Sequence, residues 1–108
     1  MTSGELAEQQ AREYLQQQGL TFVTANVRYK FGEIDLIMKQ QQTLVFVEVK
    51  YRQSQAFGGA INALSAKQIN RIRLSANAYL QQQGINPPCR FDVIAINNTQ
   101  ISWIKGCF

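Results

Sequence analysis

Residues 33–51 decide the fold, and they carry the sequence EIDLIMKQQQTLVFVEVKY. Two apolar runs, 33–39 and 43–51, flank a short glutamine-rich segment. Runs of this length that contain β-branched and aromatic residues are typical of strands, and a short polar segment between them is typical of a tight turn. The stretch therefore predicts an antiparallel hairpin.

The turn of this hairpin fixes which residues face each other. If the hairpin closes symmetrically on Gln41 and Gln42, Asp35 lies directly opposite Glu48, with Cβ atoms roughly 5 Å apart. A three-residue turn would shift the register by one residue and point Asp35 away from Glu48. The symmetric closure predicts two facing carboxylates on neighbouring strands, with Lys50 on the same face as Glu48.

The second run is apolar on both of its faces. Alternation places Val45, Val47, Val49 and Tyr51 on one face, and Leu44, Phe46, Glu48 and Lys50 on the other. A strand of this kind is covered on both sides, so an unpaired charge within it is costly. The charges of Glu48 and Lys50 near its end therefore need a partner or a function.

The rest of the sequence predicts two helices and three further strands. A capping-box pattern at 2–5 begins a helix that ends at Gly19, and a strand follows at 20–29. After a loop at 52–64, Ser65 and Gln68 form a second capping box that begins a helix ending at Gly84. Beyond Pro87 and Pro88, strands are expected at 90–96 and 100–104. The order α-β-β-β-α-β-β predicts a single α/β domain, 1–108, with a mixed β-sheet flanked by helices.

The composition limits the classes of catalytic site that the chain could contain. The chain has 108 residues, no histidine, 11 Lys and Arg against 7 Asp and Glu, and a formal net charge of +4. The lack of histidine excludes Ser-His-Asp and Cys-His nucleophile systems, a histidine general base and the usual zinc hydrolases. The positive charge fits a polyanionic partner such as nucleic acid without requiring one.

Two further patterns concern redox state and location. Cys89 and Cys107 lie far apart and form no CxxC pair, so free thiols are expected rather than a zinc site or a disulfide. The sequence shows neither a signal-peptide pattern nor an apolar run of membrane-spanning length, so a cytoplasmic location without a membrane partner is expected.

The facing carboxylates predict a metal site. Two carboxylates that close repel each other, and one lysine cannot neutralise both, whereas a divalent cation can. The expected ligands are Asp35, Glu48, the backbone carbonyl of Val49 and water, an all-oxygen set that suits Mg²⁺ or Mn²⁺. Such an ion could activate a water for attack on a phosphodiester, while Lys50 would position that water or stabilise the developing charge. The alternative is a hairpin ion-pair network without a function.

Helix one offers a further acid. Glu8 lies next to Leu15 around the predicted helix and so borders its buried stripe. It could complete the metal shell directly or through water. It could equally be a surface acid whose carboxylate reaches solvent.

Several segments together resemble a known family. They are Gly32-Glu33-Ile34-Asp35-Leu36-Ile37, Val45-Phe46-Val47-Glu48-Val49-Lys50-Tyr51-Arg52, Phe57-Gly58, Lys67 and Arg90-Phe91-Asp92-Val93. The chain resembles, over nearly its whole length, the YraN-like family of small bacterial proteins, which is similar to PD-(D/E)XK nucleases and particularly to archaeal Holliday junction resolvases. The resemblance implies a restriction-endonuclease-like fold. It matches Glu8 to the acid of the first helix, Asp35 to the motif aspartate, and Glu48 and Lys50 to the ExK pair, with Ile34 where the motif has proline.

Cations near the predicted site could contact phosphates. Lys67 and Arg71 are spaced i, i+4 on one side of the second helix, and Arg52 follows the strand that carries Glu48. The resemblance singles out Lys67. For Arg71 and Arg73, a solvated helix face is the alternative.

Other polar and aromatic residues are expected to be structural. Asp92 is predicted to pair with Arg90 or with an adjacent loop. Phe22, Phe91 and Trp103 fall within strands and are expected in the core rather than as base-stacking platforms.

Taken together, these patterns predict a metal-dependent endonuclease that binds and hydrolyses DNA, with branched or junction structures among its candidate substrates. DNA is favoured over RNA as the partner, and the chain could form a homodimer. One alternative is a nucleic-acid-binding module that keeps the fold without turnover. Another is a basic domain that contacts a second protein.

Overall fold

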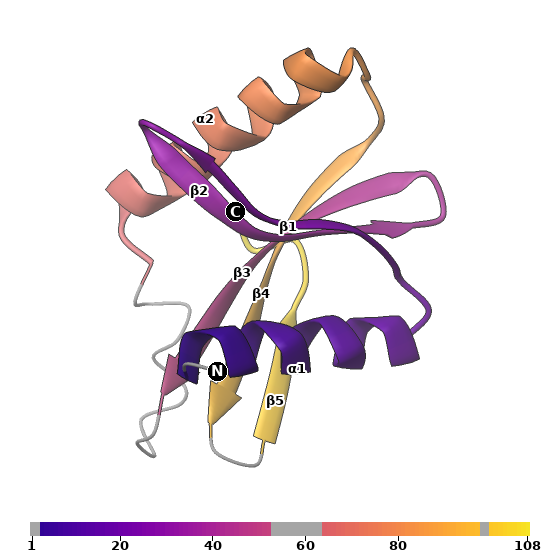
Figure 1. Cartoon of the computed structure of the whole chain (residues 1–108), viewed down its shortest axis with the longest axis vertical. Helices are drawn as coiled ribbons and strands as arrows, with labels where there is room; N and C mark the ends of the chain where they lie inside the picture. The colour runs from indigo at the N-terminus through magenta and orange to yellow at the C-terminus, as the bar shows by residue number, and fades with distance from the viewer. Residues whose placement is uncertain (1–2, 53–63, 98–99) are drawn as a thin grey trace.

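A computed structural model of the chain describes residues 3–52, 64–97 and 100–108 (Figure 1). Its elements follow the predicted order. They are α1 (Ser3–Gln17), β1 (Thr21–Tyr29), β2 (Gly32–Gln40), β3 (Thr43–Arg52), α2 (Ala66–Gln83), β4 (Cys89–Asn97) and β5 (Gln100–Ile104). Thr2 of the first capping-box pattern lies outside the described residues, and α1 begins at Ser3.

The strands form one mixed sheet in the order β1-β2-β3-β4-β5. Only β3 and β4 are parallel, and α2 lies in the connection between them; the other neighbours are antiparallel. Figure 1 shows α1 crossing the lower part of the sheet and α2 the upper part. The predicted α/β class, with a mixed sheet flanked by helices, is confirmed. Among the described residues, neither helix has the length and apolar content to cross a membrane.

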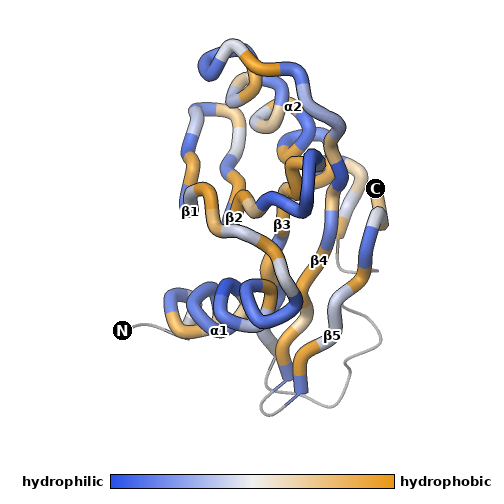
Figure 2. The backbone as a smooth tube through the Cα atoms, turned by 90° about the vertical axis from the view of Figure 1, so that its right-hand side faces the viewer, coloured by the Kyte–Doolittle hydropathy of each residue, from blue (hydrophilic) through white to orange (hydrophobic). Residues whose placement is uncertain are grey.

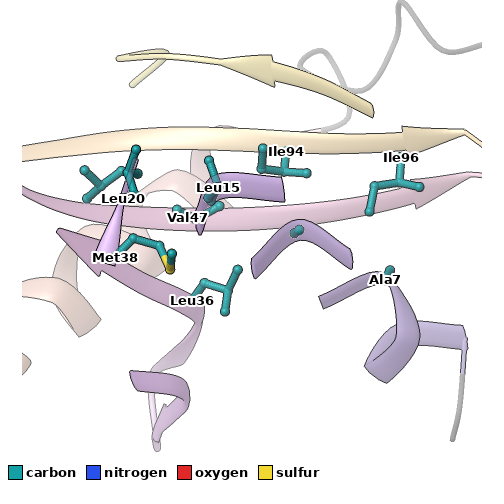
Figure 3. Packing of buried hydrophobic residues seen from close by; sticks show 10 residues of the cluster. Ala7, Leu15, Leu20, Leu36, Met38, Val47, Ile94 and Ile96 are labelled. Atoms are coloured by element: carbon teal, nitrogen blue, oxygen red, sulfur yellow. The ribbon is translucent and has the colours of Figure 1, made fainter. Parts of the chain in front are cut away.

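The two helices cover opposite faces of β3, as the alternation predicts. Val45 and Val47 belong to the core cluster that contains Ala11 and Leu15 of α1. Leu44 and Phe46 belong to a second cluster with Ala76 of α2. Figure 3 shows Ala7 and Leu15 of α1 beside Val47, Ile94 and Ile96, and Figure 2 shows long hydrophobic stretches along β3 and β4.

The hairpin of β2 and β3 has the predicted register. Its paired residues run from Gln40 with Thr43 to Leu36 with Val47, so the turn contains two residues. Gln41 of this turn has a positive φ of 55°. The paired residues end at Leu36 with Val47, and the same register continued by one residue sets Asp35 level with Glu48. The symmetric closure on Gln41 and Gln42 is therefore confirmed.

The β1–β2 pair changes faces at Asp35, which simple alternation does not predict. Ala25 pairs with Leu36, and both pack in the cluster under α1. Val27 pairs with Ile34, two residues along, yet both pack in the cluster under α2. Residues two apart on a regular strand share a face. Asn26, opposite Asp35, has a φ of 54°, and this left-handed residue turns the pair from one face to the other.

The ends of α2 are capped as predicted. The Ser65 hydroxyl accepts the backbone N–H of Gln68 at 3.1 Å, and the Gln68 side chain accepts the backbone N–H of Ser65 at 3.0 Å. Gly84 ends the helix in the left-handed conformation with a φ of 65°. Both caps satisfy backbone groups that the helix itself leaves unpaired.

The predicted structural residues take their expected places. Phe22 and Trp103 pack against the cluster under α1, and Phe91 packs against the cluster under α2. Cys89 and Cys107 are free thiols. Asp92 is fully buried and pairs with Arg90, whose Nε lies 2.9 Å from Oδ1.

The contacts of Asp92 reach further than the sequence indicated. Its carboxylate also accepts the indole N–H of Trp103 at 2.8 Å and the backbone N–H of Gly106 at 2.9 Å. Asp92 therefore ties β4 to β5 and to the segment that follows it. Both oxygens of this buried side chain therefore accept hydrogen bonds.

We expect Asp92→Ala to lower the free energy of unfolding by about 3 kcal/mol, because it leaves the Arg90 guanidinium and two N–H donors without their acceptor. Glu33→Ala is the matched control. Glu33→Ala removes an exposed ion pair with Arg28, in which the side chains of Arg28 and Glu33 are 74% and 53% exposed. It should lower the free energy of unfolding by less than about 1 kcal/mol. Urea denaturation measures both. Equal losses would mean that Asp92 contributes no more than a surface ion pair.

Candidate metal and catalytic site

Asp35 and Glu48 meet where the β2–β3 ladder ends. The two carboxyl groups are hydrogen-bonded to each other, and Asp35 Oδ2 also accepts the backbone N–H of Val49 at 2.9 Å. The register of the hairpin places Asp35 next to β3. Because β1 and β2 change faces near Asn26, the side chain of Asp35 does not follow the regular alternation of β2. The hairpin thus brings together the two carboxylates that the sequence placed opposite each other.

The pair shares a proton. Burial is the largest cause that raises the pKa of Asp35, from 3.8 to about 8, and the hydrogen bond and the negative charge of Glu48 raise it further. The N–H of Val49 lowers the pKa of Asp35 but does not offset these effects. A pKa raised this far favours one proton on the Asp35–Glu48 pair at neutral pH. One proton relieves the repulsion that would otherwise separate the two groups.

Lys50 completes the group on β3. Its Nζ lies 3.6 Å from Glu48 Oε2, and the side chains of Lys50 and Glu48 are only 14% and 16% exposed. Glu48 thus lies between the proton of Asp35 and the ammonium of Lys50. Two oxygen-bearing groups and one cation converge at the end of a buried strand, an arrangement that can bind a cation or stabilise negative charge.

Glu8 of α1 lies close enough to the carboxyl pair to interact with it electrostatically. Burial raises the pKa of Glu8, the charge of Asp35 raises it further, and a hydrogen bond from the Asn26 side chain lowers it. Glu8, Asn26 and Leu36 also line a hollow of about 500 Å³ between α1 and the first strands. The third acid is therefore beside the pair, on the side covered by α1.

Asn26 is a site residue that the sequence analysis missed. Its side chain is hydrogen-bonded to Glu8, and it lies between Ala25 and Val27, whose partners Leu36 and Ile34 flank Asp35. The available signal was an asparagine inside a strand-like run, since asparagine enters the left-handed region more readily than most residues.

The donor chemistry fits a hard divalent ion held by few protein ligands. Asp35 and Glu48 offer carboxylate oxygens, and Mg²⁺ is often held by one or two carboxylates together with waters. In the part of the chain that the structure describes, no group of three or more acidic or cysteine side chains is arranged to hold a metal ion. Glu8 therefore stands beside the carboxyl pair rather than in a ready-made three-acid shell. The N–H of Val49 serves Asp35, and the role expected for its carbonyl stays a prediction.

The predicted phosphate contacts lie apart from the pair. Lys67 and Arg71 are exposed on the first half of α2, and Arg73 is exposed as well. Arg52 is the last residue of β3, and the position of its side chain lies outside the described residues, as do Phe57, Gly58 and Gly59. The exposure of Lys67 and Arg71 fits both phosphate binding and a solvated helix face.

Comparison with known proteins groups the chain with bacterial sequences of the same length. Residues 7–96 match a family described as "Uncharacterised protein family UPF0102". A "UPF0102 protein" of Shewanella frigidimarina is 70% identical over 108 residues, which is 100% of both chains. Proteins with the same description from Shewanella denitrificans and Shewanella oneidensis are 59% and 58% identical, again over 100% of both chains. These names state no activity.

We expect the free energy of unfolding to fall as the pH rises from about 4 to about 8, because folded Asp35 has a pKa of about 8 and its ordinary value is 3.8. The folded state holds the proton more tightly, so this contribution is complete below the lower value and is lost as the pH rises through the upper one. Its slope is at most about 1.4 kcal/mol per pH unit.

Asp35→Asn should remove this slope, and Glu33→Gln, which removes the smallest of the effects that raise the pKa of Asp35, should keep most of it. Urea denaturation at pH 5, 7 and 9 makes the comparison. Parallel stability curves for the wild type and Asp35→Asn would show that Asp35 has an ordinary pKa in the folded protein.

Proposed function

We propose that this chain, which belongs to the uncharacterised protein family UPF0102, is a metal-dependent nuclease that binds DNA and hydrolyses its phosphodiester bonds. Family membership confirms the YraN-like part of the sequence resemblance. The proposed likeness to PD-(D/E)XK nucleases rests on the resemblance of Asp35, Glu48 and Lys50 to that motif. The observation that carries the proposal is the half-buried pair of facing carboxyl groups with Lys50 beside it.

Asp35 and Glu48 would hold the ion once the shared proton has left. Bound Mg²⁺ or Mn²⁺ would supply Lewis-acid activation of the phosphodiester and of a water molecule. Asp35 is fixed for this role by the N–H of Val49, and Glu48 by the adjacent strand. Release of the proton from Asp35 converts the hydrogen-bonded pair into two anionic ligands.

Lys50 and Glu8 would act around this pair. The ammonium of Lys50, 3.6 Å from Glu48, is placed to stabilise negative charge that grows on a phosphate at the site. Glu8 stands on the side of α1, where a carboxylate held by Asn26 can orient a water. The exposed Lys67 and Arg71 would hold the phosphate backbone away from the reacting bond.

One observation favours the alternative, a nucleic-acid-binding module without turnover. The shared proton satisfies the two carboxyl groups without any ion, and the described residues hold no three-acid metal cluster. A module of this kind would bind DNA with the same affinity after Asp35→Asn and would cut no substrate. The next two experiments separate it from the enzyme.

We expect Mn²⁺ to stabilise the protein by about 2.7 kcal/mol at a hundred times its dissociation constant, since it binds only the folded state. Binding requires the proton of Asp35 to leave, so at one fixed Mn²⁺ concentration the stabilisation should be larger at pH 8.5 than at pH 6. Thermal unfolding with and without Mn²⁺ measures the shift. Asp35→Asn should lose most of it and Glu33→Gln should keep it. If the wild type and Asp35→Asn respond equally, the ion binds elsewhere.

Lys50→Ala should reduce the cleavage rate by a hundredfold or more and leave DNA affinity nearly unchanged, because its charge acts mainly on the transition state. Lys67→Ala should instead weaken binding to all substrates and lower the salt slope by about one unit. Lys39→Ala changes an exposed lysine on β2 and should do neither.

Single-turnover cleavage of branched DNA with Mn²⁺, and binding at several salt concentrations, measure these effects on variants whose thermal unfolding is unchanged. If Lys50→Ala weakens cleavage and binding in equal proportion, Lys50 anchors a phosphate and has no catalytic role.

A further inference from the structure

A second hollow, of about 520 Å³, lies between the β1–β2 turn and the first half of α2. Its lining includes Lys30, Phe31 and Gly32 on one side and Lys67, Asn70 and Arg71 on the other. We refer to it as the turn groove. Three of its lining residues are cations and none is acidic. Within the described residues, none of the three cations belongs to an ion pair, so the turn groove presents uncompensated positive charge.

The close approach of α2 to Gly32 fixes the shape of the turn groove. A Cβ atom added at Gly32 would lie 2.9 Å from the Ser75 hydroxyl and 3.0 Å from the carbonyl oxygen of Arg71. Ser75 is fully buried, and its hydroxyl donates to the same carbonyl at 2.9 Å. The helix backbone therefore lies directly on the turn, and only glycine permits this contact. The walls that carry Lys30 and Arg71 are held by packed elements.

Phe31 gives the turn groove an aromatic surface. Its ring stacks on Tyr29 with centroids 5.3 Å apart and an angle of 1° between the planes. Tyr29 is anchored in turn, because its hydroxyl donates to Gln82 of α2 at 2.9 Å. Phe31 itself is 44% exposed, although a phenyl ring is normally buried. A flat, supported and exposed ring beside three cations has the features of a base-stacking platform.

We propose that the turn groove binds an unpaired stretch of nucleic acid, with one base stacked on Phe31 and the backbone phosphates held by Lys30, Lys67 and Arg71. This inference rests on the proposed function for nucleic-acid binding, and it names the substrate class as nucleic acid that contains unpaired nucleotides. Bases inside a duplex are stacked on their neighbours and do not offer a free face to a side chain. An acidic peptide would satisfy the cations but would leave Phe31 without a partner.

The turn groove and the carboxyl pair both include residues of β2. Gly32 and Asp35 are three residues apart on β2, which corresponds to roughly 10 Å along a strand. One substrate can therefore reach both places. An unpaired end or flap seated on Phe31 would set the position of the nearby backbone at Asp35 and Glu48.

The test measures binding in EDTA, so that cleavage plays no part. A fluorescein-labelled single-stranded oligonucleotide and a blunt duplex of the same sequence are titrated with each variant and followed by anisotropy. Phe31→Ala and Phe31→Leu should weaken single-strand binding about tenfold and change duplex binding less than twofold, because both remove the aromatic plane. Phe31→Tyr should restore single-strand affinity. Ile85→Ala, which truncates another exposed apolar residue at 43% exposure outside the turn groove, should bind as the wild type does.

A second comparison tests whether the cations of the turn groove bind phosphates. Lys30→Ala should lower the slope of log affinity against log salt for the single strand by about 0.7, whereas Lys39→Ala should leave this slope unchanged. Thermal unfolding of each variant shows whether it has kept its fold. Phe31→Leu removes the ring but keeps a large apolar side chain, and Phe31→Tyr keeps the ring, so the comparison does not depend on Phe31→Ala folding well.

The outcomes separate this inference from the nuclease proposal. If Phe31→Leu binds the single strand as tightly as the wild type, Phe31 is no platform and the inference is wrong, whatever the Mn²⁺ and cleavage experiments give. If polyglutamate displaces the single strand from the wild type and the Phe31 variants lose nothing, the turn groove is an acidic-peptide site and the inference is again wrong. If the protein never cleaves DNA but shows the aromatic dependence, the inference stands and the nuclease proposal fails.

Discussion

The register of the β2–β3 hairpin is the constraint on which the remaining structure depends. Because side chains alternate along a strand, one register decides at once which residues of β3 face α1, which face α2, and which acids face each other. Val47 and Phe46 enter different cores for this reason. A slip by one residue would exchange the two apolar faces of β3 between the cores under α1 and α2, and it would separate Asp35 from Glu48. The packing of the whole sheet therefore holds the carboxyl pair in place.

The carboxyl pair lowers the stability of the sheet locally. Two acids facing each other at a buried strand end would destabilise the sheet if both were charged, and the shared proton and Lys50 reduce that cost. A hydrophobic pair at the same positions would suit the core better. Such conflicts are typical of sites kept for function, and this physical argument favours a role for the pair beyond structure.

Much of the fold followed from local patterns, and the rest depends on contacts between distant segments. The register, the capping box of Ser65 and the pairing of Asp92 with Arg90 come from short-range chemistry, and each could be predicted. The change of face at Asn26 could not, because alternation assumes a regular strand and the left-handed conformation is stabilised by the packing around it. The hairpin predicted where Asp35 and Glu48 lie, whereas the shared proton depends on how deeply the completed sheet buries them.

The parallel pairing of β3 with β4 has a consequence for how the chain folds. Within the first three strands each strand pairs with the next along the chain, but β3 and β4 are separated by α2 and the segments that flank it. Closing this longer loop loses more chain entropy, so the parallel pairing is the slower one to form. The β2–β3 hairpin, which closes on a two-residue turn, can therefore bring Asp35 and Glu48 together before β4 docks against β3.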